Sequence, residues 1–358
     1  MDAELKENVR KLNELVNKNT DKNKEYDAHA YKGGENIIYF GAPGTGKSYG
    51  IAKYIRENGI QDYSDKKEFN NVFRVTLYAD YSYSDFVGQI MPTIKKRDGE
   101  NIVTYDYVPG IFVKALKEAI VNPRKPVFLV LEEMSRSNVA AIFGDIFQLL
   151  DRDHDGASEY SIRNDQIYKE IYPNGNTEES IRIPSNLFII GTVNTSDQNV
   201  FAMDTAFKRR FSWRYVSTHI SDLGTFQNNP QIKVRISNNN IYTTDWYNLY
   251  TKINSFIVDD LGLSEDKQIG PYFIKFEQND PEQLIKENLL HYIWDDVLGV
   301  SFAISNGSTE SLFDSDIKSF SQLYEKYDDS NIFSRAFLKK LKNYGNDELM
   351  DAQNDDNE

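Results

Sequence analysis

The residues best suited to chemistry lie in a glycine-rich turn near the start of the chain. Gly41-Ala-Pro-Gly-Thr-Gly-Lys47-Ser48 fits the pattern G-x-x-x-x-G-K-[ST] without a mismatch, between an apolar run and a stretch with helical spacing. Glycines let backbone N–H groups turn inward around phosphates, and the start of the next helix favours negative charge. We expect Lys47 to reach the β- and γ-phosphates and the Ser48 hydroxyl to ligate Mg²⁺. The predicted phosphate cradle comprises Gly41, Pro43, Gly44, Thr45, Gly46, Lys47 and Ser48.

Two carboxylates end a second apolar run, in the sequence VFLVLEEMSRSN from residue 127. Parallel α/β sheets bind ligands beyond the carboxyl ends of their strands. In phosphoryl-transfer enzymes one acid at this place supports Mg²⁺, and another residue orients the attacking water. We therefore predict that Glu132 supports the metal together with Ser48 and that Glu133 positions the water. The alternative is a solvated acidic pair at a strand end, which is the commoner case for such a pair taken alone.

A third polar group follows the apolar run Leu187–Thr192. The side-chain amide of Asn194 can hydrogen-bond a γ-phosphate or its attacking water. An arginine in the run Lys208-Arg209-Arg210 can reach the phosphate of another subunit and stabilise charge in the transition state. We predict catalytic roles for Asn194 and for this arginine pair, and the sequence leaves open whether Arg209 or Arg210 is the finger. A solvated basic face is the alternative for the basic run.

The elements that position these residues alternate between apolar runs and helical stretches, which predicts an α/β fold with a parallel sheet in an αβα core. The candidate strands are Asn36–Phe40, Val72–Leu77, Val127–Leu131 and Leu187–Thr192. Two segments, 91–110 and 158–186, have the texture of hairpins, and Asp98-Gly99 is a turn signal in the first.

Composition shifts mark four segments along the chain. Residues 1–30 predict an N-terminal helix and a polar linker, and residues 31–217 predict the large nucleotide-binding subdomain. Residues 218–344 predict a smaller helical lid, because 246–261 and 282–298 both have amphipathic helical spacing. Residues 345–358 contain six acidic side chains and no basic one, which predicts an acidic disordered tail.

Composition also excludes several classes of protein. The 358 residues include no cysteine, which excludes disulfides and thiol catalysis, and their four histidines lack metal-ligand spacing. There is no apolar run long enough to cross a membrane and no apolar core of a secretory signal, so we expect a cytoplasmic protein. The net charge of −14 disfavours a long DNA-binding surface, so we expect DNA contact mainly through a partner.

In order and spacing, the three motifs resemble those of AAA+ ATPases, and in detail those of the McrB-type motor subunits of modification-dependent restriction systems. The resemblance covers about residues 31 to 300 and rests on Tyr81–Gly88 with Met91-Pro92, Glu132–Asn138, Asn194–Asp197, Asp204–Trp213 and Gln268–Phe273. These passages are similar, in order, to the family's YSYEDF-type segment, DEINRAN-like stretch, MNxxD signature, arginine-rich helix and IGHSYF-like lid motif.

The resemblance implies a ring, hexameric in this family, that hydrolyses GTP or ATP with Mg²⁺ at its subunit interfaces. It also implies nucleotide binding by Asp197, an McrC-like nuclease partner, and a role in DNA restriction and antiviral defence. Three departures stand out. Glu132 replaces the usual Asp, Gln198 replaces a frequent Arg, and the roughly 30 residues before the core are too few for a DNA-recognition domain.

Two alternatives remain open from the sequence. A MoxR-like AAA+ chaperone that remodels proteins and hydrolyses ATP shares these motifs. A nucleotide-gated scaffold that binds nucleotide with little turnover also shares the phosphate loop, although an intact Glu133, Asn194 and arginine pair argue against it.

Overall fold

A computed structural model of the chain describes residues 30–97, 100–173, 180–196, 201, 203–237, 240–277, 280–299 and 311–342. The predicted acidic tail, Asp197, Gln198 and all of the predicted N-terminal segment except residue 30 lie outside these residues. The chain forms two compact units. The larger comprises the chain up to Tyr39, Ser48–Val193 and Asn199–Arg214, and the second comprises Phe40–Lys47, Asn194–Gln198 and the chain from Tyr215 onward. The predicted domain boundaries at 31, 218 and 345 stay predictions.

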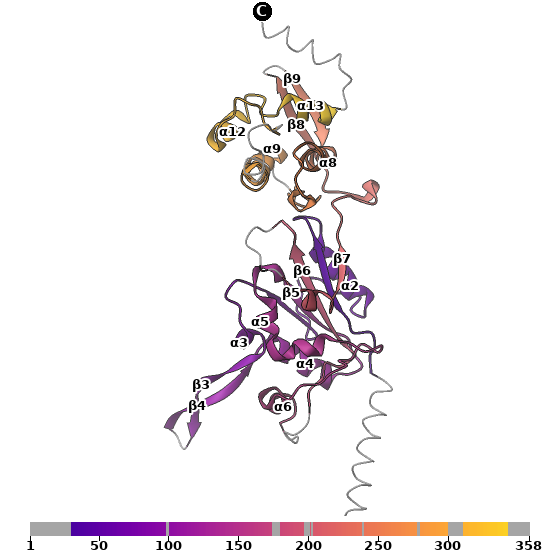
Figure 1. Cartoon of the computed structure of the whole chain (residues 1–358), viewed down its shortest axis with the longest axis vertical. Helices are drawn as coiled ribbons and strands as arrows, with labels where there is room; N and C mark the ends of the chain where they lie inside the picture. Colours follow the sequence, from indigo (N-terminus) through magenta and orange to yellow (C-terminus); the bar gives the residue numbers. More distant parts are fainter. Residues whose placement is uncertain are drawn as a thin grey trace, which may run out of the picture. The chain divides into compact units, whose positions relative to one another are not determined.

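A five-stranded sheet in the order β2-β5-β6-β1-β7 organises the larger unit (Figure 1). Its strands are β1 (Asn36–Gly41), β2 (Val72–Thr76), β5 (Val127–Glu132), β6 (Leu187–Asn194) and β7 (Ser212–Tyr215). The pairs β2–β5 and β5–β6 are parallel. Each of the four predicted strands begins at the predicted residue and ends within two residues of the predicted end. The predicted parallel αβα core is therefore confirmed, and β7 is a strand that the sequence did not reveal.

The central strands are apolar over their whole length because the sheet is covered on both faces. Every side chain of Val127–Leu131 on β5 is fully buried, as strands of a covered parallel sheet require. Helix α4 contributes Phe112, Val113 and Leu116 to this core. The helices of this unit are α2 (Lys47–Glu57), α3 (Tyr83–Phe86), α4 (Ile111–Val121), α5 (Val139–Phe143), α6 (Asp165–Ile171) and α7 (Thr205–Lys208).

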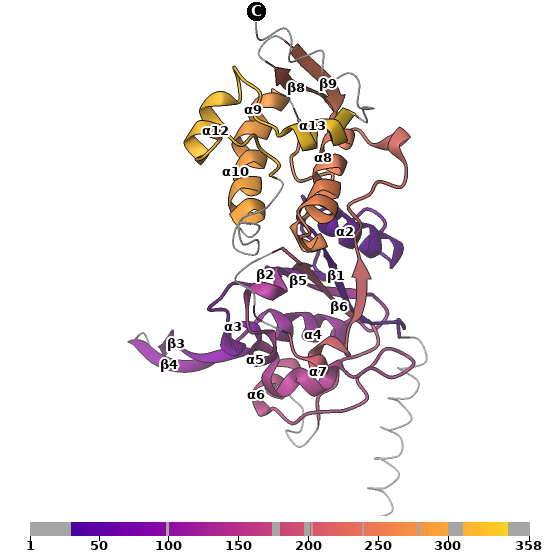
Figure 2. The same cartoon turned by 45° about the horizontal axis from the view of Figure 1, so that its top comes forward.

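One predicted hairpin is confirmed, and the other is confirmed only as a single antiparallel bridge between Ile162 and Ile181. Strands β3 (Gly88–Arg97) and β4 (Glu100–Pro109) pair antiparallel and extend away from the sheet in both views (Figures 1 and 2). Between these two residues the segment 158–186 contains helix α6. The Asn164 side chain caps this helix by accepting hydrogen bonds from the N–H groups of Gln166 and Ile167. That cap favours a helix within a segment whose texture resembles a hairpin.

The second unit is mostly helical, as predicted, and also carries a two-stranded sheet that the sequence did not reveal (Figure 2). Both predicted amphipathic helices are confirmed, because residues 246–260 and 281–298 are helical throughout, with π-helical turns inside each. Trp246, Tyr250 and Phe256 are fully buried in the core of this unit. Its main elements are β8 (Gln231–Ser237), β9 (Asn240–Asp245), α8 (Trp246–Ser255), α9 (Pro281–Leu284), α10 (Leu290–Tyr292), α12 (Phe320–Lys326) and α13 (Arg335–Lys342).

None of the described helices is both long enough and apolar enough to cross a bilayer.

Candidate nucleotide site

The predicted phosphate loop joins the end of β1 to the start of α2. Gly44 and Gly46 have φ angles of +75° and +94°, a region that favours glycine, so these two residues let the chain turn around a central space. The Lys47 ammonium lies 3.0 Å from the carbonyl oxygen of Gly41 and 2.9 Å from that of Ala42, and Lys47 is only 8% exposed. The Lys47 side chain therefore folds back over the loop and bonds the main chain at the start of the loop. Ser48 is exposed on the first turn of α2.

The loop is packed backbone to backbone against residues 270–273. Gly270 N–H donates to the Pro43 carbonyl and Tyr272 N–H donates to the Gly44 carbonyl, both at 2.8 Å. A Cβ atom on Gly44 would lie 2.3 Å from the backbone nitrogen of Phe273, so only glycine fits. The passage Gln268–Phe273 was noted in the sequence for its resemblance to a lid motif. Residue spacing alone gave no sign that it contacts the loop.

Glu133 has an unusual backbone at the end of β5. Its φ and ψ of 56° and 44° are left-handed, and it is the one non-glycine residue with positive φ in the described parts of the chain. Its N–H donates to the Thr192 hydroxyl at 3.0 Å, and its carboxylate lies 3.4 Å from the Arg136 side chain. Such strain persists only where the surroundings enforce it, and it is concentrated at functional sites. The sequence pattern did not identify Thr192, which holds this turn.

The neighbouring acid, Glu132, has a cation beside it that the sequence did not reveal. The Arg74 guanidinium on β2 lies 3.8 Å from the Glu132 carboxylate and 3.0 Å from that of Asp65. Strand pairing explains the contact, since Arg74 is opposite Val130 on β5. A single arginine within the run VFRVT carries no signal of such a role. Arg74 is therefore placed to orient the carboxylate predicted to support the metal.

The donor atoms available for Mg²⁺ fit that ion. Ser48 offers a hydroxyl and Glu132 a carboxylate, and Mg²⁺ is usually bound through one or two protein oxygens together with substrate phosphates and waters. A cluster of three or more acidic or histidine side chains suited to a metal does not occur among the residues described. A site of this kind therefore takes its remaining ligands from the nucleotide and from water.

The predicted sensor, Asn194, is the last residue of β6 and is half-buried. The next residue, Thr195, donates its N–H to the Gly41 carbonyl at 3.3 Å, which joins the end of β6 to the end of β1. The phosphate loop, the acidic pair and Asn194 each follow one of three adjacent strands, β1, β5 and β6. Since these strands are parallel, their carboxyl ends lie at the same end of the sheet.

The two predicted arginines lie at the amino-terminal end of β1, and their surroundings differ. Arg210 donates two hydrogen bonds to Asp151 at 3.1 and 2.7 Å and a third to the Ala206 carbonyl, and its guanidinium lies 4.1 Å from the centre of the Phe147 ring. Only 10% of its side chain is exposed. Arg209 is exposed, and the described part of the chain holds no acidic group within ion-pair distance of it.

Hydrogen bonds at the two ends of β1 locate the two arginines. The Asn36 side chain donates to the Arg210 carbonyl at 3.0 Å, whereas Phe40, near the other end of the strand, accepts from Val216 N–H at 2.8 Å. The arginine pair therefore lies beside the first residue of β1, and the phosphate loop follows its last. Within the larger unit, no hydrogen bond or ion pair among the described residues joins Arg209 or Arg210 to Glu132 or Glu133.

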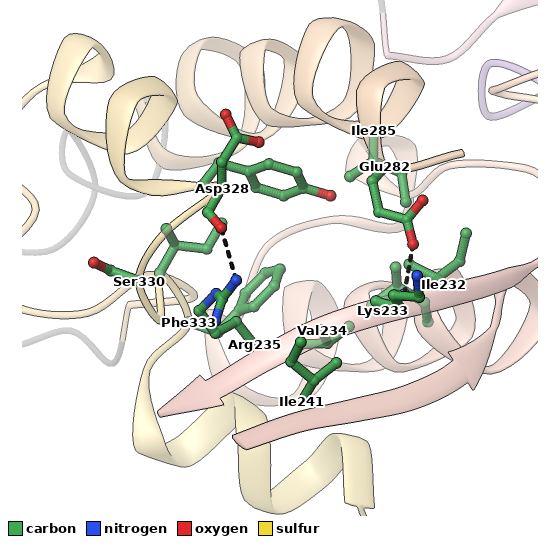
Figure 3. A pocket seen from close by; sticks show the side chains of 13 residues that line it. Ile232, Lys233, Val234, Arg235, Ile241, Glu282, Ile285, Asp328, Ser330 and Phe333 are labelled. Carbon is green, nitrogen blue, oxygen red and sulfur yellow. Dashed lines mark hydrogen bonds between the residues drawn. The ribbon is translucent and has the colours of Figure 1, made fainter. Parts of the chain in front are cut away.

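A separate cavity of about 170 Å³ lies within the second unit (Figure 3). Its apolar wall includes Ile232 and Val234 of β8. At one side Lys233 N–H donates to the Glu282 carboxylate at 3.1 Å, and at the other Arg235 donates to the Asp328 carbonyl at 2.8 Å. None of the predicted site residues lines it.

Comparison with known proteins identifies the family of this chain. Residues 36–211 match the family model described as AAA domain (dynein-related subfamily). The Type II restriction enzyme BsuMI component YdiS of Bacillus subtilis (strain 168) is 34% identical over 322 residues, which span 84% of this chain and 88% of that protein. The Type IV methyl-directed restriction enzyme EcoKMcrB subunit of Escherichia coli (strain K12) is 30% identical over 179 residues, which span 50% of this chain and 34% of that protein. The chain therefore belongs to the McrB-type AAA+ ATPases, a family of nucleotide hydrolases with members in restriction systems.

Proposed function

We propose that this chain is the nucleotide-hydrolysing motor of a DNA-restriction complex, that its subunits assemble as a ring, and that the ring drives a separate McrC-like nuclease. One observation carries the proposal. The phosphate loop, the strained acidic turn and Asn194 follow three adjacent parallel strands at one edge of the sheet, while the arginine pair lies beside the opposite end of β1. A site divided in this way is complete only when another subunit supplies the arginine.

In the half of the site that each subunit builds for itself, Lys47 binds the phosphates. Ser48 and Glu132 would hold Mg²⁺, which neutralises charge on the transferring phosphoryl group. Glu133 orients and polarises the attacking water, and its left-handed backbone fixes the direction of the carboxylate. Asn194 hydrogen-bonds the γ-phosphate or the water, and Asp197 contributes to nucleotide binding by resemblance to the family.

In the half that a subunit builds for its neighbour, we assign the finger to Arg209. Its side chain is exposed, whereas the Arg210 side chain donates hydrogen bonds to Asp151 and Ala206 of its own subunit. An arginine already satisfied within its own subunit is poorly placed to reach a phosphate elsewhere. Arg210 then supports the segment that presents Arg209. A hexamer is the ring that the family resemblance favours.

The restriction role rests on the relatives. A component of a Type II restriction enzyme and a subunit of a Type IV methyl-directed restriction enzyme are both similar to this chain. The net charge of −14 supports DNA contact through a partner rather than over a broad surface of this chain. This favours a restriction motor, acting in antiviral defence, over a MoxR-like remodelling chaperone.

The test is to co-purify the protein with the product of its neighbouring reading frame. GTP and ATP turnover are then measured with and without DNA, alongside DNA cleavage, for the wild type and for Glu133→Gln. We expect DNA-linked turnover of one of the two nucleotides, and cleavage that is lost in the Glu133→Gln complex. A pair that shows neither DNA-linked turnover nor cleavage contradicts the restriction role, and wild-type turnover by Glu133→Gln contradicts the catalytic assignment.

A further inference from the structure

Asn36, the first residue of β1, lies at the centre of a buried hydrogen-bond network. It is 4% exposed, and its amide nitrogen donates to the Leu150 carbonyl at 2.8 Å and to the Arg210 carbonyl at 3.0 Å. Its amide oxygen accepts from Arg152 through Nε at 3.1 Å and through Nη2 at 2.9 Å. Two donor and two acceptor positions of one amide are therefore all in use.

Arg152 fixes which way this amide faces. Its guanidinium also donates to the carbonyls of Gly156 and Leu187, at 2.9 and 3.1 Å, so it is held from both sides. A guanidinium only donates, so the atom of Asn36 that faces it must be the oxygen. The NH₂ group of Asn36 must then point at Leu150 and Arg210. Burial lowers the pKa of Arg152 to about 9, which still leaves it charged at neutral pH.

The contact with Arg210 is made to its backbone carbonyl, in the residue that follows Arg209. The Arg210 side chain is tied to Asp151, and the carbonyl of Leu150, the residue before Asp151, is the other acceptor of the Asn36 amide. The amide of Asn36 therefore bonds the arginine segment and the segment that anchors it. Arg209, whose exposed side chain makes no ion pair among the described residues, is the residue immediately before Arg210.

We propose that Asn36 is a positioning residue for Arg209, because it fixes the backbone from which that side chain projects toward the neighbouring subunit. The inference rests on the proposed role of Arg209 as the finger. It also makes β1 a direct link, since the strand begins at Asn36, ends at Gly41, and spans roughly 20 Å. One strand thus joins the segment that serves the neighbour's nucleotide to the loop that binds the subunit's own.

The chain offers a matched control in Asn186. This asparagine is 1% exposed, stands directly before β6, and donates to the carbonyls of Ala119, Asn122 and Lys125 at 2.8 to 3.1 Å. It resembles Asn36 in burial and in donating to main-chain carbonyls. Its amide oxygen has no hydrogen-bond partner among the described residues, and it makes no contact with the arginine segment. Loss of the Asn36 amide also removes an acceptor from the buried Arg152, so it should destabilise the fold at least as much as loss of the Asn186 amide. Only loss of Asn36 should displace Arg209.

The first measurement follows the position of residue 209 directly. The chain has no cysteine, so Arg209→Cys can carry a single nitroxide spin label. We expect Asn36→Ala to add a mobile component to the electron paramagnetic resonance spectrum and Asn186→Ala to leave the spectrum unchanged. Equal spectra for the two variants overturn the proposal. Asn36→Asp keeps the acceptors for Arg152 and loses both donors, and it serves if the alanine variant does not fold.

The second measurement is turnover by the assembled protein. Small displacements of a catalytic group lower rates by about a hundredfold, so we expect Asn36→Ala to lower kcat roughly 10- to 100-fold with KM within about twofold. Asn186→Ala should change kcat by less than about twofold. In an Arg209→Ala background, Asn36→Ala should cause no further loss, because both changes act through one side chain.

Different results contradict the finger role of Arg209 and the positioning role of Asn36. If Arg209→Ala keeps full turnover, the proposed finger is wrong. If Arg209→Ala is inactive but Asn36→Ala matches Asn186→Ala, the finger stands and the positioning role of Asn36 is wrong. A fall in kcat of the same factor with and without Arg209 also overturns the positioning role.

Discussion

Replacing Arg210 with alanine should mainly lower stability, whereas replacing Arg209 with alanine should mainly lower turnover. Arg210→Ala removes two hydrogen bonds to the Asp151 carboxylate, one to Ala206 and the contact with the Phe147 ring, and leaves a carboxylate that is 26% exposed without its cation. Charged hydrogen bonds contribute about 1.5–3 kcal/mol and a cation–π contact about 0.5–2 kcal/mol. We expect a loss of roughly 2–4 kcal/mol in unfolding free energy after solvent screening of the partly exposed pair.

Thermal unfolding followed by circular dichroism measures the difference. At about 2–4 °C per kcal/mol, Arg210→Ala should lower Tm by roughly 5–15 °C. Arg209→Ala, at an exposed side chain, should change stability by less than about 0.5 kcal/mol while turnover falls by about a thousandfold. Arg210→Lys keeps the charge without the planar fork and should lie between wild type and Arg210→Ala in Tm. The reasoning is refuted if Arg209→Ala melts as early as Arg210→Ala, or if it keeps its turnover.

Three further predictions concern backbone strain and burial. Glu133→Gly should raise the unfolding free energy by about 1 kcal/mol while abolishing turnover, because glycine relieves the left-handed strain; an unchanged or lower midpoint in urea contradicts this. Gly44→Ala should weaken binding of a fluorescent nucleotide at least about tenfold through the clash with Phe273, whereas Gly33→Ala, with a φ of +99° and no neighbour within 4 Å, should bind normally. Burial raises the pKa of Tyr63 to about 12, above its ordinary value, so its stabilising contribution is complete below about pH 10 and is lost as pH rises toward 12. The difference in absorbance at 295 nm between wild type and Tyr63→Phe should titrate near pH 12, and a midpoint near 10 contradicts the burial.

The sheet and one half of the site could be predicted from the sequence because their signals are local. The runs Val127–Leu131 and Leu187–Thr192 are apolar without interruption, which is typical of strands covered on both faces. The phosphate loop is a continuous motif whose glycines match the backbone angles found at Gly44 and Gly46. Residues that follow parallel strands share an edge of the sheet, so strand assignment alone grouped the acidic pair with the loop.

The rest could not be predicted because it depends on pairing between distant segments. Asn36 and Arg210 are 174 residues apart, and nothing in either local sequence marks the contact between them. Arg74 reaches Glu132 only because β2 is the neighbour of β5. The choice between Arg209 and Arg210 likewise depended on Asp151, which follows a run of apolar residues and carries no motif.

Short elements also escaped the sequence patterns. Strand β7 has four residues, of which two are exposed, so neither its length nor its polarity distinguishes it from a loop. Helix α6 was hidden in a segment rich in β-branched and turn-forming residues, where the Asn164 cap decides the outcome.

Mixing two inactive variants tests the central claim, a site shared between subunits, most directly. Glu133→Gln keeps its finger and loses its own site, and Arg209→Ala keeps its own site and loses its finger. In an equal mixture that co-assembles, one interface in four pairs an intact site with an intact finger, so turnover should recover to about a quarter of the wild-type value. A mixed assembly, verified by size-exclusion chromatography, that is no more active than either parent contradicts the account.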